Sequence, residues 1–505
     1  MDAFVGLDLG TSSLMGVLVN AVDGTTLATA ERALELLEPE PLAAEQDPEA
    51  WWRAACEVLR ELAAFAASSD VRAIGLGLTG QKHALLPLGD GDRPLQDAVL
   101  WCDARSTLET AEAHARAPRA MLGKRTGALA FPGYLVPKWL RLRRLRPDVV
   151  AATRRLVFAK DWLRLRLTGR FLTDRTEASA SLLYDIGKKA WSPELLEAFD
   201  VPASFLPEVV RSSDPGGRVT AEAAAATGLE EGLPIVGGAG DNEAAALGSG
   251  AVGEGRVAVV LGTSATVIAH HGSRGSAGGL VWGRHALRRG YSATGVVLCA
   301  GRALEWIRHA AFPTDFSPEE VIEAARASDV REGPLVFVPS LAGERSPIPD
   351  PGATGAFIGL RPGNARGHLA RAVLEGVALS IAEVVRQMRG AGVPVTELRL
   401  TSGGAASKFW RALVAAASDL PVVHAGDAEG PGRGAAMLAA RGTGRHGSTL
   451  VEIASRWVHP SPPEIPTAAE VARMAGLATM LIGARNALRS VGVPGPTLPG
   501  STRSS

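Results

Sequence analysis

A motif that occurs twice, about half a chain apart, is the strongest constraint on how this chain can fold. Residues 7–19 read LDLGTSSLMGVLV, and residues 259–271 read VVLGTSATVIAHH. In each copy an apolar strand leads into a Gly-Thr-Ser turn, and a second apolar strand follows. Gly10 and Gly262 lie 252 residues apart (262 − 10) in a chain of 505 residues. We therefore expect one α/β domain type that has been duplicated, with a boundary near residues 249–256.

The segments around the two copies predict a mixture of strands and helices. The Asp23-Gly24 turn leads from the first hairpin into a third strand, which argues against a dinucleotide-binding opening, where a helix would follow the first strand. A helix is expected from Asp47 to Ala66, and a buried strand over residues 71–80. A long amphipathic segment over residues 368–390 precedes another strand that ends in TSGG. This alternation is typical of an α/β fold.

These patterns divide the chain into four expected parts. We expect an N-terminal lobe over residues 1–250 and a C-terminal lobe over residues 251–445. A helical segment should follow over residues 446–490. The remaining residues, 491–505, are rich in Pro, Gly and Ser, so a disordered tail is expected there.

Composition excludes several classes of function. Lys plus Arg and Asp plus Glu both total 53, so the chain has no net charge that would attract nucleic acid or an anionic membrane. The three cysteines are far apart, which fits neither a disulfide framework nor a zinc site and suits a reducing compartment. There is no signal-peptide pattern and no apolar run of about 18 residues. A cytoplasmic location is therefore expected.

The repeated turns are candidate phosphate sites. Gly10, Thr11 and Ser12 form the first turn, and Gly262, Thr263 and Ser264 form the second. Backbone N–H groups and hydroxyls at a strand end suit phosphate oxygens, and two equivalent turns are stronger evidence than one tight hairpin. Asp8 precedes the first turn and could hold hydrated Mg²⁺, although it could also cap the turn.

A second glycine-rich cluster, GGAGDNEAAALGSG, places Asp241 and Asn242 at the start of a helical run of alanines. A carboxylate at that position could simply cap the helix, because the helix dipole favours negative charge there. It could also act as a general base, with Asn242 binding a substrate. The flanking glycines, which allow close approach of a ligand, favour the catalytic interpretation.

Two other patterns are weaker. Gly403 and Gly404 follow a strand and could pass under a nucleotide, but such turns often need glycine for geometry alone. The basic run PKWLRLRRLR, residues 137–146, could bind anions or a membrane surface. With zero net charge, we favour a surface helix whose arginine stems cover apolar neighbours.

Taken together, the motifs resemble the FGGY-type carbohydrate kinases, from about Phe4 to about Arg441. The marks, in the order the family has them, are GLDLGTSS, AEQDPEAWW, GLTGQKHA, VLWCDAR, PKWL, KDWLRLRLTG, GGAGDNEAAALGSG, VLGTSA, GERSPIPDP, TSGGAAS and GRGAAMLAARG. The resemblance implies two duplicated actin-like (ribonuclease H-like) α/β domains flanking a catalytic cleft. It also implies ATP, Mg²⁺ and a small sugar or polyol as partners, with no nucleic acid and no membrane; a homodimer is left open.

The resemblance also implies roles for individual residues. Asp241 corresponds to the catalytic base, and Lys82, His83 and Asn242 lie in the sugar-binding positions with it. Asp8 corresponds to the metal-associated carboxylate. The nucleotide positions are Gly10, Thr11, Ser12, Gly262, Thr263, Ser264, Gly403 and Gly404. The xylulose kinase branch is the most similar, which implies phosphorylation of D-xylulose to D-xylulose 5-phosphate.

This sequence departs from the family pattern at two positions that matter. Met15 stands where relatives often have a basic residue near the terminal phosphates, and Lys82 stands where xylulose kinases often have Met. Lys82 could contact substrate or simply point to solvent. Two alternatives therefore stay open: a kinase of the same fold for ribulose, gluconate or glycerol, and a relative that binds sugar or nucleotide without transferring phosphate.

Overall fold

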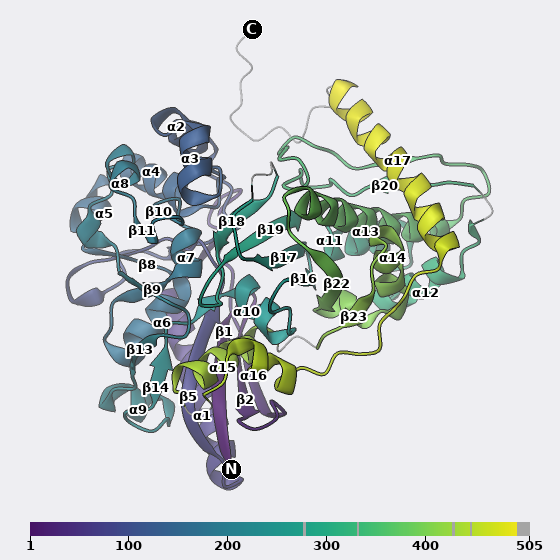
Figure 1. The fold of residues 1–505 in the computed structure, drawn as a ribbon. Coiled ribbons are helices and arrows are strands. Elements are labelled where there is room, and N and C mark those ends of the chain that lie inside the picture. Colours follow the sequence, from purple (N-terminus) through teal and green to yellow (C-terminus); the bar gives the residue numbers. More distant parts are fainter. Residues whose placement is uncertain (276–278, 331–332, 427–429, 445–446, 492–505) are drawn as a thin grey trace. The chain divides into compact units, whose positions relative to one another are not determined.

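The computed structural model describes residues 1–275, 279–330, 333–426, 430–444 and 447–491, which pack into two units (Figure 1). The first unit combines Met1–Val252, Val281–Ser292 and Glu429–His459. The second combines Gly253–Leu280, Ala293–Ala428 and Pro460–Ser505. The units therefore alternate along the chain, whereas the sequence suggested contiguous lobes. Almost all of the expected tail, residues 492–505, lies outside the described residues.

The first unit is built on a mixed sheet. Its strands run in the order β13-β14-β5-β1-β2-β3, and β15 also pairs with β5. The strands β1 and β2 form the predicted hairpin, whereas β1 and β5 run parallel. The bounds are β1 Asp2–Leu9, β2 Ser13–Asn20, β3 Thr26–Ala33, β5 Arg72–Gly80, β13 Pro215–Arg218, β14 Pro234–Val236 and β15 Ala239–Gly240.

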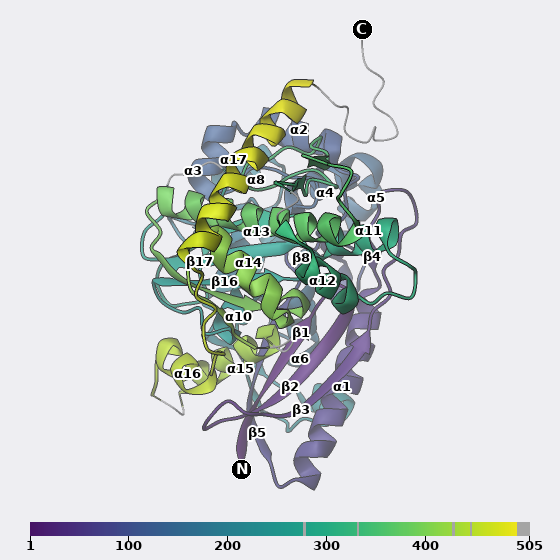
Figure 2. The same ribbon diagram turned by 90° about the vertical axis from the view of Figure 1, so that its right-hand side faces the viewer.

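The two faces of this sheet are covered by different helices. Alternate residues of β1 point to opposite faces, so Val5 and Leu7 share a core cluster with Trp51 of α1 (Pro48–Ser68), whereas Phe4 packs with Met437 of α15 (Gly430–Gly442). Figure 2 shows α1 beside β3 and α15 beside β1. The side chain of Asp47 caps α1 by accepting the Glu49 N–H at 2.8 Å.

Close approach of α15 to the sheet requires glycine. A Cβ on Gly6 would lie 1.8 Å from the Gly432 carbonyl oxygen, and a Cβ on Gly77 would lie 1.9 Å from that of Ala435. The same holds where α15 meets α10 (Asp241–Gly248), since a Cβ on Gly434 would lie 1.9 Å from the Ala244 carbonyl oxygen. These contacts explain why the GRGAAMLAARG segment is rich in small residues.

A second apolar cluster of the first unit lies in the long connection between β5 and β14. Here α4 (Leu135–Leu145) carries the basic run; Trp139 and Leu142 are buried, whereas Leu145 at its end is exposed. Arg143 and Arg144 pair with Asp200 and Glu109. The run is therefore largely a surface helix, as favoured, with the exception of one buried lysine described below.

The second unit repeats the sheet of the first. The strands β16 and β17 form an antiparallel hairpin, and β22 runs parallel to β16, in the order β19-β17-β16-β22-β23. The bounds are β16 Gly255–Leu261, β17 Ala265–His271, β19 Tyr291–Val297, β22 Val395–Thr401 and β23 Val422–His424. Helices of this unit include α11 Gly301–Ala311, α12 Pro318–Ala327, α13 Arg366–Gly390, α14 Lys408–Ser418 and α17 Ala468–Val491. Duplication of one α/β domain type is thereby confirmed.

Among the described helices, none combines the length and the apolar character that a membrane span would require.

Candidate functional site

Three parallel strands of the first unit end in one row, and each is followed by a predicted site segment. Leu9 of β1 pairs with Gly80 of β5, and Gly80 pairs with Gly240 of β15. The turn that begins at Gly10, the loop Gln81–His83 and the helix that begins at Asp241 therefore start side by side. Ligands of α/β sheets bind outside the carboxyl ends of strands, so this edge is the candidate site.

Asp8 projects from β1 directly opposite Met15 of β2. Its Oδ1 is sealed from solvent and has no hydrogen-bond partner among the described residues. Burial, with a further contribution from the negative charge of Asp241, raises the pKa of Asp8 to about 7. A buried carboxylate oxygen without a hydrogen-bond partner is unfavourable. Binding of a cation at that oxygen would remove the cost, so the environment of Asp8 suits a cation-binding residue.

Asp241 is the first residue of α10, and Gly240 occupies the N-cap with no side-chain cap hydrogen bond, so Asp241 does not cap the helix. Its Oδ1 accepts the Asn242 N–H at 2.7 Å, and the Gly240 N–H donates to Thr176 Oγ1 at 2.8 Å. Burial raises the pKa of Asp241, whereas the positive charge of Lys82 lowers it. The carboxylate is thus oriented locally through its Oδ1.

Lys82 does not point to solvent, because its side chain is only 12% exposed and pairs with Glu243 Oε2 at 2.9 Å. Ser292 Oγ donates to Glu243 Oε1 at 3.4 Å, and burial raises the pKa of Glu243. A Cβ on Gly240 would strike Lys82 Cδ at 2.4 Å, so the lysine stem lies across the residue before Asp241. The structure therefore makes Lys82 a neighbour of the candidate base.

The backbone and the ring of His83 are both fixed by contacts with neighbouring residues. Its N–H donates to Glu177 Oε1 at 3.1 Å, its Nδ1 lies 2.8 Å from the Ala180 carbonyl oxygen, and its ring stacks on Tyr134 at 4.2 Å between centroids. The residue has a positive φ of 69°, which a non-glycine residue adopts only when its surroundings enforce it. Such immobilisation is expected of a ligand-binding side chain.

Sequence reasoning missed the residue that fixes this loop, Lys138 of α4. Its Nζ donates to the carbonyl oxygens of His83, Val99 and Leu100 at 2.7, 3.0 and 2.9 Å. The residue is 2% exposed, and burial lowers its pKa to about 7. The PKWL motif and its helical spacing were the only available signals, and neither distinguishes Lys138 from the neighbouring arginines.

The first Gly-Thr-Ser turn is braced by two glutamines that sequence reasoning did not single out. Gln81 donates to the Gly10 carbonyl oxygen at 3.3 Å, and Gln46 donates to that of Thr11 at 2.8 Å. The Thr11 hydroxyl donates to Gln81 Oε1 at 3.2 Å and accepts the Trp101 indole N–H at 3.0 Å. Ser12 is exposed, so its hydroxyl is the more accessible of the two.

A buried network of charges supports the loop and the base from behind. Lys160 pairs with Asp161 at 2.5 Å and Asp174 at 2.7 Å, and all three side chains are fully buried. Asp174 accepts the Thr176 hydroxyl at 2.6 Å, and Thr176 in turn accepts the Gly240 N–H. Burial raises the pKa of Glu177 well above its usual value. Breaking one member of such a network is costly, so these residues rigidify the site.

The second unit brings its own predicted residues together. A Cβ on Gly404 would lie 2.9 Å from the Leu261 carbonyl oxygen, immediately before the second turn, whereas a Cβ on Gly403 would meet nothing within 4 Å. Thr263 accepts the backbone N–H groups of Ala300 and Arg302 at 3.0 and 3.1 Å, so the turn is tied to the start of α11. Gly262, Ser264 and Gly403 thus share one edge of the second sheet.

The donor set of the first unit fits a hydrated divalent cation better than a fully protein-coordinated one. Among the described residues, no group of three or more His, Cys, Asp or Glu side chains is placed to hold a metal ion. Mg²⁺ commonly keeps most of its waters and uses one or two carboxylates with phosphate oxygens. Asp8, with its unpartnered Oδ1, meets that requirement.

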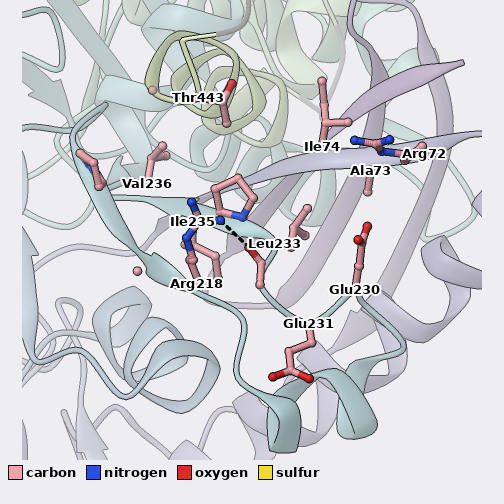
Figure 3. A pocket seen from close by; sticks show the side chains of 15 residues that line it. Arg72, Ala73, Ile74, Arg218, Glu230, Glu231, Leu233, Ile235, Val236 and Thr443 are labelled. Carbon is pink, nitrogen blue, oxygen red and sulfur yellow. Dashed lines mark hydrogen bonds between the residues drawn. The ribbon is translucent and has the colours of Figure 1, made fainter.

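A hollow of the first unit lies away from this edge of the sheet. Figure 3 shows a hollow of about 390 Å³ near Arg72, at the opposite end of β5 from Gly80, where Arg218 donates to the Gly232 carbonyl oxygen at 2.8 Å. Its other labelled residues are Ala73, Ile74, Glu230, Glu231, Leu233, Ile235, Val236 and Thr443. The candidate site therefore rests on chemistry and strand register and not on cavity size.

Comparison with known proteins identifies the family. The N-terminal domain of the FGGY family of carbohydrate kinases matches residues 3–248, and its C-terminal domain matches residues 257–443. The chain is 35% identical over 440 residues to the xylulose kinase of Escherichia coli K12, covering 86% of this chain and 89% of that protein. It is 34% identical over 466 residues to a glycerol kinase of Alkalilimnicola ehrlichii, covering 89% and 92% of the two chains.

A solved structure gives the same result. The crystal structure of xylulose kinase from Rhodospirillum rubrum superimposes with a TM-score of 0.90 at 30% identity, over 97% of this chain and 99% of that one. Both domain matches and the duplicated sheets agree with the resemblance noted from the motifs. The chain belongs to the FGGY family of carbohydrate kinases.

Proposed function

We propose that this kinase transfers the γ-phosphate of ATP to a ketose, D-xylulose, to give D-xylulose 5-phosphate, with Asp241 as the general base. The observation that carries the proposal is the position of Asp241. It lies at the edge of the first sheet where the parallel strands end. The strand before Asp241 pairs with the strand that leads into the Lys82–His83 loop, and that strand pairs with the one that carries Asp8. The relatives at 30% identity or more include several named xylulose kinases, which supports the choice of sugar.

In this mechanism the sugar lies against the Lys82–His83 loop, Asp241 and Asn242. The free oxygen of Asp241 accepts the proton of the attacking hydroxyl as that oxygen approaches the γ-phosphorus in line. Lys82 favours the ionised form of Asp241, because its positive charge opposes the effect of burial, which raises the pKa of that carboxyl. The Asn242 N–H, which donates to Asp241 Oδ1, fixes the direction in which the proton is received.

The nucleotide side uses the turns. Backbone N–H groups and hydroxyls of Gly10, Thr11 and Ser12 and of Gly262, Thr263 and Ser264 bind phosphate oxygens, and Gly403 and Gly404 pass beneath the adenosine. Asp8 would hold the waters of a phosphate-bound Mg²⁺, which supplies charge neutralisation on the transferring group. Met15, opposite Asp8, contributes no charge, so stabilisation of the phosphates depends on these donors.

The three cysteines are free thiols, with Cys102 exposed, which suits a reducing cytoplasm as the place of reaction.

Substrate identity is tested with a panel of sugars in an assay that couples ADP release to a colour change. D-xylulose, ribulose, gluconate and glycerol are compared at equal concentration. We expect the highest kcat/KM with D-xylulose. A preference for glycerol or gluconate would move the assignment within the family, and ATP hydrolysis without dependence on any sugar would contradict a kinase role.

A second candidate, a kinase for another polyol, is favoured by one observation. The Lys82–Glu243 ion pair replaces an apolar contact at the sugar loop, so the loop presents charge where a thioether is common in xylulose kinases. The sugar panel decides between the two candidates. A kinase for another polyol should show a lower KM for that polyol than for D-xylulose, with the same ATP KM.

A further inference from the structure

Five basic residues of the first unit come from five separate segments. Arg175 begins α7 (Arg175–Ser179), Arg211 follows β12 (Glu208–Val210), and Arg284 ends β18 (Val281–Arg284). Lys189 lies in the turn between β10 (Tyr184–Asp185) and β11 (Ala190–Trp191), and Arg289 lies in the loop before β19. None of these residues belongs to the site described above.

Strand register and packing bring these segments together. In the parallel pair β9 (Leu172–Asp174) and β12, Asp174 pairs with Val210, so Arg175 and Arg211 leave their strands side by side. The Arg284 N–H donates to Ser179 Oγ of α7 at 2.9 Å. The Arg284 guanidinium lies 4.5 Å from the centre of the Tyr291 ring, and Tyr184 packs on Trp191 beyond the Lys189 turn.

The charges of these residues act on one another. The pKa of Lys189 is lowered first by the positive charge of Arg284, then by burial, and then by Arg175, Arg211 and Arg289. The pKa of Arg284 is lowered first by burial; Tyr291 opposes this, and the charge of Arg175 lowers the pKa further. Cations that repel one another make the empty cluster less stable, and an anion bound among them would remove that cost.

The buried polar atoms of the cluster are poorly satisfied. Arg284 is 5% exposed and Tyr184 is fully buried, yet the Arg284 Nε and the Tyr184 hydroxyl make no hydrogen bond of ordinary geometry among the described residues, and their polar neighbours are Tyr291 for Arg284 and Arg175 for Tyr184. The Nε of Arg175 is in the same condition. The neighbouring carboxylates are already engaged, since Asp174 pairs with Lys160 at 2.7 Å and Asp185 with Arg125 at 3.1 Å.

We propose that Arg175, Lys189, Arg211, Arg284 and Arg289, with Tyr184, form a binding site for a phosphate group, separate from the Gly-Thr-Ser turns. Buried arginines are normally paired, and guanidinium groups bind phosphate oxygens through charge-assisted, often bidentate, hydrogen bonds. The recessed positions of Arg284 and Tyr184 favour a small phosphate-bearing molecule over a polymer, which would need donors on an exposed surface.

The same short helix connects this site to the catalytic one. Arg175 opens α7, Thr176 accepts the Gly240 N–H that precedes Asp241, and Glu177 accepts the His83 N–H. An anion that orders Arg175 should therefore change how tightly the sugar is held, while the nucleotide KM stays constant. The proposal does not depend on which sugar is phosphorylated.

The test is isothermal titration calorimetry of the full chain with inorganic phosphate, at constant ionic strength and with a non-hydrolysable ATP analogue present to occupy the phosphate turns. Lys189→Glu combined with Arg289→Glu changes two exposed residues, and Arg256→Glu, an exposed arginine of the second unit, is the matched control. We expect saturable binding that weakens at least about tenfold in the double variant and is unchanged in the control. Binding of equal strength in the double variant, or no saturable heat in the parent protein, would overturn the proposal.

Thermal unfolding provides a second test, in which the double variant and added phosphate are each expected to raise the Tm. Phosphate should raise the Tm of the parent protein. Without phosphate, the double variant should have the higher Tm, because its charges no longer repel, and phosphate should not raise it further. A lower Tm in the absence of phosphate would indicate a purely structural cluster. Repeating the titration with a ketose 5-phosphate distinguishes the ligand source, since tighter binding than inorganic phosphate points to a sugar phosphate and equal binding to the free anion.

Discussion

The two Gly-Thr-Ser hairpins share a sequence but differ in how they close. In the first unit the last pair is Leu9 with Leu14, so the turn spans Gly10–Ser13. In the second unit the last pair is Leu261 with Ala265, and the turn is one residue shorter. The residue two before the glycine is Asp8 in one and Val260 in the other. One duplicated hairpin therefore carries an ionisable group in one copy and an apolar one in the other.

The loops beside the two hairpins also differ in polarity, with charged side chains in the first unit and glycines in the second. The parallel strand beside each hairpin, β5 or β22, ends in Gln81-Lys82-His83 in the first unit and in Ser402-Gly403-Gly404 in the second. The first loop is bound by buried charges, whereas the second lies against the backbone before the turn. Equivalent positions on one scaffold therefore carry polar and charged side chains in one copy and glycines in the other.

The proposed difference between the two units depends most strongly on Asp241 being the general base. Asp241→Asn should lower kcat by about 10²- to 10⁴-fold, the usual contribution of a general base. Nucleotide binding, which we assign mainly to turns and glycines, should be unchanged in a fluorescence titration with ADP. Glu231→Gln, in the hollow of Figure 3, is the control carboxylate and should be neutral. Near-normal turnover in Asp241→Asn would refute the assignment.

Lys138→Met tests whether buried charge holds the sugar loop. The change removes the ammonium donor from three buried carbonyl oxygens, of which those of Val99 and Leu100 still accept the backbone N–H groups of Leu85 and Asp103 at 2.9 and 3.4 Å. A buried polar group that loses its partner typically costs about 1–3 kcal/mol. We expect the sugar KM to rise by tens of fold, with little change in the ATP KM. Arg141→Met, on the same helix and paired with Glu40 at 3.1 Å, is the control. Equal effects on both KM values would show a general loss of stability.

The pH dependence of the parent protein sharpens this test. Burial lowers the pKa of Lys138 from 10.5 to about 7, and only the ammonium form has three donors for three carbonyls. The sugar KM should therefore increase as pH rises through that pKa, and this increase should be absent in Lys138→Met. The unfolded chain keeps the proton longer, so between the two pKa values this group makes folding more favourable as pH rises. Chemical unfolding and kinetics should thus change in opposite directions.

The glycine side is tested by a matched pair of substitutions. Gly404→Ala would place a Cβ 2.9 Å from the Leu261 carbonyl oxygen and 2.7 Å from Leu261 Cγ, whereas Gly403→Ala meets nothing within 4 Å. We expect the ATP KM to rise several-fold in Gly404→Ala only, with the sugar KM unchanged in both. Initial rates at varied ATP measure this. A larger effect from Gly403→Ala would mean that a ligand, and not Leu261, limits that position.

The smallest expected effect is a shift in a pH profile. Lys82→Met combined with Glu243→Gln removes the positive charge that lowers the pKa of Asp241, without leaving Glu243 unpaired. The base must be ionised, so the acidic limb of kcat/KM should move to higher pH. Glu243→Gln alone keeps Lys82 and is the control. An unmoved limb in the double variant would show that Lys82 does not act on Asp241.

Features that depend on residues close together in the sequence could be predicted, whereas features that depend on distant residues could not. The hairpins, the Asp47 cap and the helix beginning at Asp241 depend on neighbouring residues, and these were predicted. Lys138 was not, because in a run of arginines it resembles any surface lysine, and its burial depends on carbonyls that the fold brings from residues 83, 99 and 100. The return of Glu429–His459 to the first unit likewise leaves no local pattern.

That return has a consequence for synthesis of the protein. The face of the first sheet that carries Gly6 and Gly77 is covered by α15, whose last residue is Gly442. A nascent chain leaving the ribosome therefore displays this apolar face until nearly the whole polypeptide has been translated. Domains usually fold from the N-terminus as they emerge, but this one must wait for its own distant helix.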